Sequence, residues 1–386
     1  MKSLKMYKYL IVITVTLLTL FSCNNTNSNY PEISNIPTKD KIVAYDKYET
    51  ITIEPNIPTS QIGKLEIING TLCYIDYLFC YLYYISDDGL LKERKLGIGN
   101  GPNEINCGAI STYSVMQNGD ISFFGSSDDI YIYSSELRHK KDASFRLKRD
   151  RNKMAPEVEK NPDDFETYTF PRFIVCRTFG DKVYINNNST AHGFNYFETP
   201  DKYAQSCRII TEYDIPNKKI GRLLGNGLPE MYKGSSDKNY VFSEFTFDID
   251  EKGNFYIAFL ADSLIYKFNK DFKPATAFGY KGKDMDTDYI SITKPKDIYQ
   301  KANEQYNTKG WYTWIEYIPE KNWLCRSYHK GDSHNYDGLQ IYKDNILIAD
   351  INVPVGFRPI GYIRPYLYSD AVVENDKLLF YKIKIN

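Results

Sequence analysis

The densest group of side chains that could hold a metal ion or exchange a proton lies near the C-terminal end of the sequence. This group contains two of the four histidines of the chain, and its members are His329, Asp332, His334 and Asp337. Imidazole and carboxylate groups serve both as metal ligands and as acid–base catalysts. The apolar stretches 323–328 and 339–342 on either side are typical of paired strands, which places the group at a hairpin tip. A hairpin tip points outward unless other segments fold over it.

A third histidine, His192, ends the polar stretch of residues 186–192 (NNNSTAH). Such a stretch is typical of a surface loop, and loops often carry binding residues. We therefore treat His192 as a candidate ligand-binding residue. The alternative is a solvated side chain without a partner.

Two glycine-rich segments each end in a glutamate. Residues 97–104 (GIGNGPNE) contain Glu104, and residues 221–230 (GRLLGNGLPE) contain Glu230. Neither segment has the Gly-Lys-Ser/Thr ending of a phosphate-binding loop. Glycines that permit a positive φ explain both segments as tight connections between elements. Glu104 and Glu230 remain candidate ligands.

Several classes of function receive no support from the sequence. It lacks a G-x-S-x-G nucleophile elbow, an H-E-x-x-H zinc motif and a catalytic cysteine signature. Lys plus Arg number 48 and Asp plus Glu number 49, so there is no electrostatic reason to expect a nucleic-acid partner. The six cysteines after Cys23 lie mostly in apolar stretches without a C-x-x-C pair, which favours buried thiols.

The N-terminus predicts export. Lysines within the first eight residues precede an apolar run over residues 9–21, the order of a secretory signal peptide over residues 1–22. The run of about 13 residues is shorter than the roughly 20 that span a bilayer. It ends in Leu20-Phe21-Ser22-Cys23, which resembles the lipobox of bacterial lipoproteins. This resemblance implies cleavage before Cys23, acylation of its thiol and anchoring to a lipid membrane.

The residues after Cys23 are polar and uncharged (24–29, NNTNSN), which predicts a flexible tether over residues 23–40 and a folded domain over residues 41–386. The tether lacks an acidic cluster that would resemble the surface-export signal of Bacteroidetes lipoproteins. We therefore expect a protein of the cell envelope, anchored in the outer membrane and facing the periplasm.

A repeated pattern predicts the fold. Aromatic residues, which favour strands, make up 15% of the chain. The pattern is a turn with Gly, Asn or Asp, a strand, a second turn and a strand rich in aromatics, and its clearest copy is residues 250–279. The related units begin near residues 69, 118, 180, 321 and 375. Six copies predict an all-β, six-bladed β-propeller, with a β-sandwich as the alternative.

The ends of the repeat predict how the ring closes. The unit near residue 375 has too few residues left for a four-stranded blade. We therefore expect a strand over residues 42–53 to complete this blade. The unequal spacing of the units predicts short helical insertions or lids at residues 152–168 and 295–309, on one face of the ring.

The glycine-rich segment that ends in Glu104 also carries a family resemblance. Gly97, Gly99, Gly101, Pro102 and Glu104 match the G-x-G-x-G-P-x-E loop that often ends the blades of TolB-like, six-bladed propeller lipoproteins of Bacteroidetes. With the lipobox and the NHL-like unit at residues 250–279, the chain resembles this family over most of residues 40–386. The resemblance implies the fold and the location, but no particular reaction.

Two hypotheses about function follow. In the first, a monomeric, lipid-anchored propeller binds a protein or glycan partner on the face with the long loops, without catalysis and without a cofactor. In the second, an envelope enzyme acts on a sugar or lactone with a divalent metal in the propeller channel, held by Glu104, Glu230 and residues 186–188. Three or more carboxylate, amide or imidazole groups converging at the channel would favour the second hypothesis.

Overall fold

The computed structural model describes residues 29–35, 45–102, 104–126, 129–140, 145–146, 161–234, 240–290, 292 and 298–385. The predicted signal peptide, Cys23 and the first part of the predicted insertion at residues 152–168 lie outside the described residues. Within these ranges no helix is long and apolar enough to cross a membrane.

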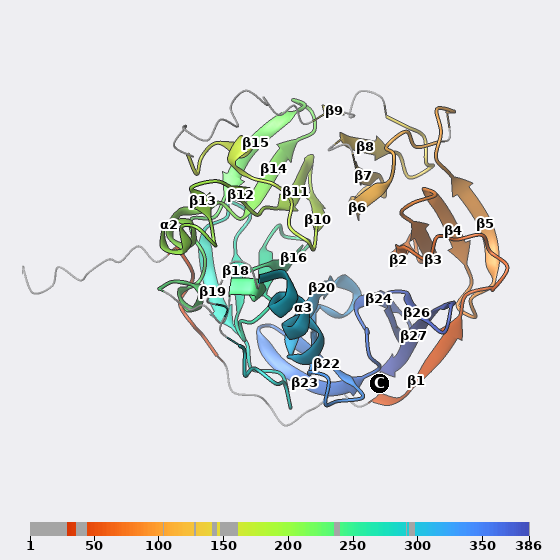
Figure 1. The fold of residues 1–386 in the computed structure, drawn as a ribbon. Helices are drawn as coiled ribbons and strands as arrows, with labels where there is room; N and C mark the ends of the chain where they lie inside the picture. Colours follow the sequence, from red (N-terminus) through yellow and green to blue (C-terminus); the bar gives the residue numbers. More distant parts are fainter. Residues whose placement is uncertain are drawn as a thin grey trace, which may run out of the picture.

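Six antiparallel sheets stand in a ring, as predicted (Figure 1). Blade one is β2 (Gly63–Ile68), β3 (Thr71–Asp76), β4 (Tyr81–Ile85) and β5 (Leu91–Leu96). Blade two is β6 (Ile110–Val115), β7 (Ile121–Gly125), β8 (Asp129–Tyr133) and β9 (Phe145–Arg146). Blade three is β10 (Cys176–Phe179), β11 (Lys182–Asn186), β14 (Ile210–Asp214) and β15 (Lys219–Leu224).

The other three blades follow the same order from the centre outward. Blade four is β16 (Phe245–Ile249), β17 (Phe255–Phe259), β18 (Ile265–Phe268) and β19 (Pro274–Phe278). Blade five is β20 (Trp311–Ile318), β21 (Trp323–His329), β22 (Asp337–Lys343) and β23 (Ile346–Val353). Blade six is β24 (Pro359–Ile363), β25 (Tyr366–Ser369), β27 (Lys377–Ile385) and β1 (Tyr45–Thr52), with the short β26 (Val372–Glu374) beside β27.

The N-terminal strand closes the ring, as predicted. β1 pairs antiparallel with β27, and the pair Glu49 and Lys382 adds an ion pair of 3.1 Å. Blade six, however, begins at Pro359 rather than near residue 375. The turn between its first two strands, at Arg364 and Pro365, has none of the Gly, Asn or Asp residues that mark the other units, so the repeat could not be recognised there.

Each blade buries both of its faces, and neighbouring blades share a hydrophobic cluster. In β3 the side chains of Leu72 and Tyr74 pack towards blade six, whereas those of Cys73 and Ile75 pack towards blade two. This follows from the alternation of side chains along a strand. The six cysteines in the described part of the chain are buried free thiols, as predicted.

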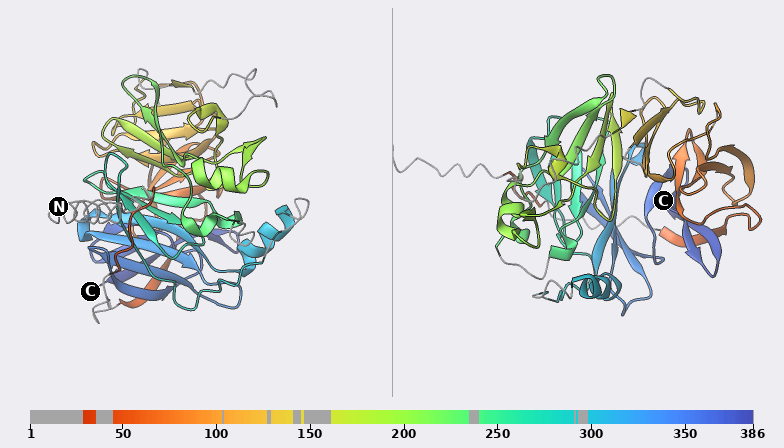
Figure 2. Two further views of the ribbon diagram at one scale, coloured as in Figure 1. Left: turned by 90° about the vertical axis from the view of Figure 1, so that its left-hand side faces the viewer. Right: turned by 45° about the horizontal axis from the view of Figure 1, so that its top comes forward.

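The two faces of the ring differ in their connections. The turn face carries the tight turns between the first and second strands of the blades, such as the one at Gly253 (φ 81°). The loop face, which Figure 1 views, carries the long connections β11–β14, β19–β20 and β21–β22. Helices α2 (Pro200–Ser206) and α3 (Ile298–Thr308) both project from it (Figure 2). α3 lies in a predicted insertion, whereas α2 was not predicted.

Part of the predicted tether packs on the rim of the ring. Tyr30 is buried against Phe259, Tyr266 and Phe268, and its hydroxyl donates to the carbonyl of Gly227 over 3.0 Å. Residues 29–35 also run beside β19, where Ile33 forms a parallel bridge with Ala277. The structure therefore differs from the prediction of a tether up to residue 40. The polar composition of residues 24–29 does not extend to the apolar Tyr30 and Ile33.

Candidate functional site

The centre of the ring holds two cavities, one open to each face. Both are lined by Tyr113 and Arg177, which lie between them. At this waist the Trp314 ring contacts two cations: Lys64 Nζ is 4.1 Å and the Arg177 guanidinium carbon 5.0 Å from its centre. Cation–π contacts of this kind hold a cation in place without neutralising it.

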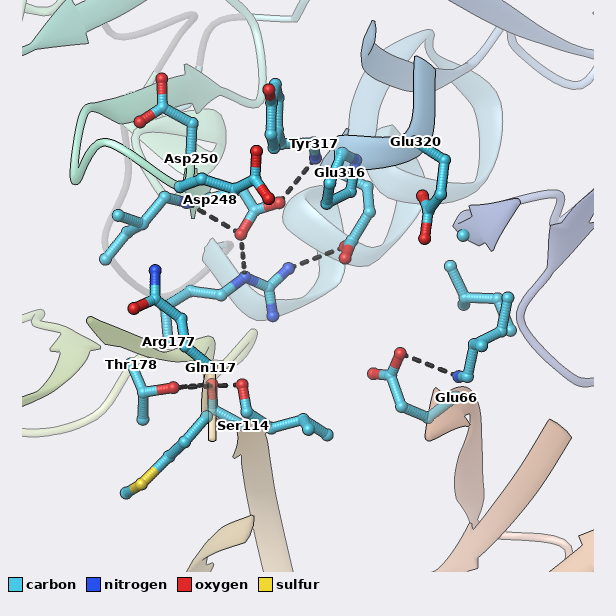
Figure 3. A pocket seen from close by; sticks show the side chains of 18 of the residues that line it. Glu66, Ser114, Gln117, Arg177, Thr178, Asp248, Asp250, Glu316, Tyr317 and Glu320 are labelled. Atoms are coloured by element: carbon cyan, nitrogen blue, oxygen red, sulfur yellow. Dashed lines mark hydrogen bonds and ion pairs between the residues drawn. The ribbon is translucent and has the colours of Figure 1, made fainter. Parts of the chain in front are cut away.

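The turn-face cavity, of about 280 Å³, is acidic (Figure 3). The described lining of this cavity contains one guanidinium, that of Arg177, and six carboxyl groups, those of Glu66, Asp248, Asp250, Glu251, Glu316 and Glu320. Arg177 donates to Asp248 through Nε (2.7 Å) and to Glu316 through a terminal nitrogen (2.9 Å). Burial raises the pKa of Glu316 to about 8, although Arg177 opposes this shift.

The buried carboxylates of the turn-face cavity are hydrogen-bonded to other groups of the protein. Asp248 also accepts from the amide of Tyr317 (2.6 Å), and Glu316 accepts from the Trp314 indole nitrogen (2.9 Å). The Glu66 carboxylate accepts the hydroxyl of Tyr113 over 3.0 Å. These carboxylates therefore stabilise the waist of the channel.

The loop-face cavity, of about 230 Å³, has a different character. The four serine and threonine hydroxyls in its lining make no hydrogen bond with any described residue, and they belong to Ser111, Thr112, Thr246 and Thr313. The Thr246 hydroxyl is inaccessible to solvent as well, and the residue is 2% exposed. Because buried polar groups in folded proteins are nearly always paired, this hydroxyl stands out.

Cations dominate the charge of the loop-face cavity. Its lining contains Lys64, Arg172 and Arg358 besides the waist residue Arg177, and one carboxylate, Asp370. Burial raises the pKa of Asp370 to about 6, against the opposing effect of Lys64. Its Oδ1 accepts from the amides of residues 65 and 371, both over 2.7 Å, which fixes the junction between blades six and one.

The structure brings two members of the predicted histidine group together. His329 Nδ1 and Asp337 Oδ1 are 2.8 Å apart, and this hydrogen bond raises the pKa of His329. Asp332 is exposed, and its amide donates to the carbonyl of Thr308 at the end of α3. His334 contributes a backbone contact within the turn. An insertion thus folds over this hairpin tip, and none of these residues is in the lining of either central cavity.

His192 lies at the tip of a small hairpin on the loop face, β12 (Thr190–Ala191) and β13 (Phe194–Asn195). Its side chain is 72% exposed, and its Nδ1 lies 3.0 Å from Glu198 Oε2. The Gly193 amide and His192 lower the pKa of Glu198. The pair belongs to the surface of the hairpin and does not line a central cavity.

Glu104, Glu230 and Asn186 have structural contacts. Glu104 Oε2 accepts the Gly101 amide over 2.7 Å, which closes the glycine-rich loop after β5. Glu230 is exposed in a short 3₁₀ turn, 3.3 Å from Lys233 Nζ. The amide of Asn186 bridges the backbone of residues 173 and 175. They do not line the central cavities, so the structure does not assemble the metal site of the enzyme hypothesis from them.

No group of three or more His, Cys, Asp or Glu is arranged to hold a metal ion within the part of the chain that the structure describes. Two residues of the loop-face cavity with unused hydrogen-bonding capacity, Lys64 and Thr246, belong to no motif. Their only signal in the sequence is an inner strand in which polar and apolar residues alternate (GKLEII and FTFDI).

Comparison with solved structures supports the fold. A member of the duf4221 family from Bacteroides vulgatus matches with a TM-score of 0.61 and 11% identity, over 89% of this chain and 98% of that one. A protein of Bacteroides fragilis whose name gives it as exported matches at a TM-score of 0.49 and 13% identity, over 92% and 99%. Protein-family models and curated sequences give no match. At 11% identity, the first of these similarities concerns the propeller fold alone.

Proposed function

We propose that this protein is a lipid-anchored propeller of the cell envelope that binds a glycan at the loop-face mouth of its channel, without catalysis. The anchor is the acylated Cys23, in the outer membrane and facing the periplasm, as in the TolB-like propeller lipoproteins with NHL-like repeats that the sequence resembles. The observation that carries the binding site is the set of serine and threonine hydroxyls around one cavity that pair with no described residue, those of Ser111, Thr112, Thr246 and Thr313.

The hydroxyls favour a sugar over a peptide. A threonine or serine hydroxyl both donates and accepts, as a sugar hydroxyl does, so the two can pair in either direction. The cavity is smaller than the roughly 300 Å³ at which drug-sized pockets begin. We therefore expect it to take the end of a glycan rather than an internal stretch. Because the proposed role is binding without catalysis, the glycan is released unchanged.

Titration calorimetry of the full chain in mild detergent tests the site. The probes are oligogalacturonate, a heparin-derived oligosaccharide and a neutral cello-oligosaccharide of equal length. Thr313→Val keeps the shape of a half-buried side chain in the cavity lining and removes its hydroxyl, so it should weaken binding by about five- to tenfold. The matched control is Thr50→Val on the exposed outer strand β1, which should bind as the wild type does. Absence of binding of every probe, or cleavage of a bound probe, contradicts this function.

The anchor is tested separately by cell fractionation. Wild-type protein should sediment with membranes, and Cys23→Ala should appear in the soluble fraction because it lacks the acceptor of the lipid. Cys73→Ala is the matched control, since Cys73 is buried in blade one and should leave the membrane association unchanged. If Cys23→Ala still sediments with membranes, the lipid anchor is wrong.

A further inference from the structure

We infer that the loop-face cavity recognises an acidic sugar, through an oxyanion that Lys64 and Arg358 bind together. This inference rests on the proposed function and adds the charge of the ligand to it. The oxyanion is a carboxylate or a sulfate, since both present several acceptor oxygens to cationic donors.

Lys64 is the central residue of this inference. The residue is 9% exposed, and its ammonium has no hydrogen bond and no ion pair with any described residue. It contacts the rings of Trp314 (4.1 Å) and Tyr113 (5.7 Å), and its charge lowers the pKa of Asp370 and of Glu316 without a hydrogen bond to either. Buried charges are normally paired, because leaving water is costly for them. The ammonium is therefore held by the rings while its three donors stay available to an anion.

Arg177 is not available for the same purpose. Although it lines both cavities, its guanidinium is directed towards Asp248 and Glu316 on the turn-face side (Figure 3). Arg358 is half-buried in the loop-face lining, and its guanidinium has no hydrogen bond or ion pair with a described residue. Its positive charge lowers the pKa of Asp370, another residue of the same lining.

The segment before β10 supplies a third cation. Arg172 is exposed, and its guanidinium lies 5.0 Å from the Tyr306 ring of α3. The amides of Arg172 and Phe173 donate to the Glu244 carboxylate, which fixes this segment beside the cavity. Since Arg172 is exposed and Lys64 is buried, an acidic ligand meets a cation at the entrance and another at the bottom.

Calorimetry with the same three probes tests the inference. Wild-type protein should bind at least one acidic oligosaccharide about tenfold or more tightly than the neutral one, and added salt should weaken this preference. Oligogalacturonate distinguishes a carboxylate ligand from the sulfate ligand that the heparin-derived probe represents. Lys64→Met should remove the preference for the acidic probe and leave the affinity for the neutral probe unchanged.

Two further variants keep the test decisive. Arg358→Gln lies at a half-buried position and should fold even if Lys64→Met does not, and it should lower the affinity for the acidic probe several-fold. Lys92→Met on the exposed strand β5 is the matched control and should bind as the wild type does. Equal binding of acidic and neutral probes, or wild-type affinity in both Lys64→Met and Arg358→Gln, overturns the acidic ligand but retains glycan binding. Absence of all binding overturns both.

Discussion

Arg177 of blade three and Glu316 of blade five are joined by a hydrogen bond of 2.9 Å across the channel, although their blades are not neighbours in the ring. Asp248 of blade four, which lies between them in the ring, accepts a second bond from the same guanidinium. The three residues therefore connect three consecutive inner strands at their closest approach to the axis.

Removing the cation of this network should strongly destabilise the ring. Arg177→Met leaves the Asp248 carboxylate buried without its cationic partner and removes the donor to Glu316, and loss of one partner of a buried pair typically costs about 3–5 kcal/mol. Urea unfolding at pH 7 measures the loss. Lys92→Met, at an exposed position of β5, is the control and should unfold within about 0.5 kcal/mol of the wild type. A comparable loss in both variants would mean that the network contributes nothing specific.

Glu316 should make the stability of the protein decrease with rising pH. Burial raises its pKa to about 8 in the folded chain, above the value of about 4.3 for an exposed glutamate. The folded state thus holds this proton more tightly than the unfolded state. The contribution is full below the unfolded pKa and is lost as the pH rises through about 8, by up to about 1.4 kcal/mol per pH unit.

Glu316→Gln removes this titration and keeps an oxygen for the Trp314 indole. Between pH 5 and pH 9 the unfolding free energy of the variant should therefore fall less than that of the wild type. Glu320→Gln, an exposed carboxylate of the same cavity, should retain the wild-type pH dependence. Parallel curves for the wild type and Glu316→Gln would contradict the assignment.

The two glutamates of the glycine-rich segments should behave differently from each other. Glu104→Ala removes the acceptor of the Gly101 amide and should lower the unfolding free energy by about 0.5–1.5 kcal/mol. Glu230→Ala is the matched comparison: its side chain is 90% exposed, so we expect no measurable change. Neither substitution should alter glycan affinity. A loss of affinity in either variant would restore that glutamate as a ligand.

Tyr30 should control whether the N-terminal segment stays on the rim. Tyr30→Ala removes its edge-on contacts with Phe259, Tyr266 and Phe268, so limited proteolysis between residues 24 and 40 should become faster. The unfolding midpoint of the ring should change little, because the segment adds to an outer edge. Tyr48→Ala is the control at an exposed position of β1. Unchanged proteolysis in Tyr30→Ala would show that other contacts hold the segment.

The sequence predicted the ring because its signals are local. Turns such as the one at Gly253 need a positive φ, and the strands beside them are rich in aromatics, so each unit could be recognised by itself. The closing strand followed from the shortage of residues after 375. The start of blade six was missed because the turn at Arg364 and Pro365 lacks those residues.

The candidate site was not predicted, for a geometric reason. Lys64 and Thr246 are far apart in the sequence and come together only because inner strands of different blades converge on one axis. The histidine group was a candidate because four possible ligands lie close together in the sequence. In the structure these residues lie close together because they belong to one turn between β21 and β22. The better signal was the alternation of polar and apolar residues in the inner strands. It can be recognised only once the fold shows which strands line the channel.

The contact of Tyr30 with blade four bears on how the molecule stands in the cell. If Cys23 carries the lipid that we propose, only residues 24–29 separate it from the point where the chain is fastened to the rim, a reach of about 25 Å at full extension. The attachment then lies on the rim of the ring and not on either of its faces, so it covers neither mouth of the channel.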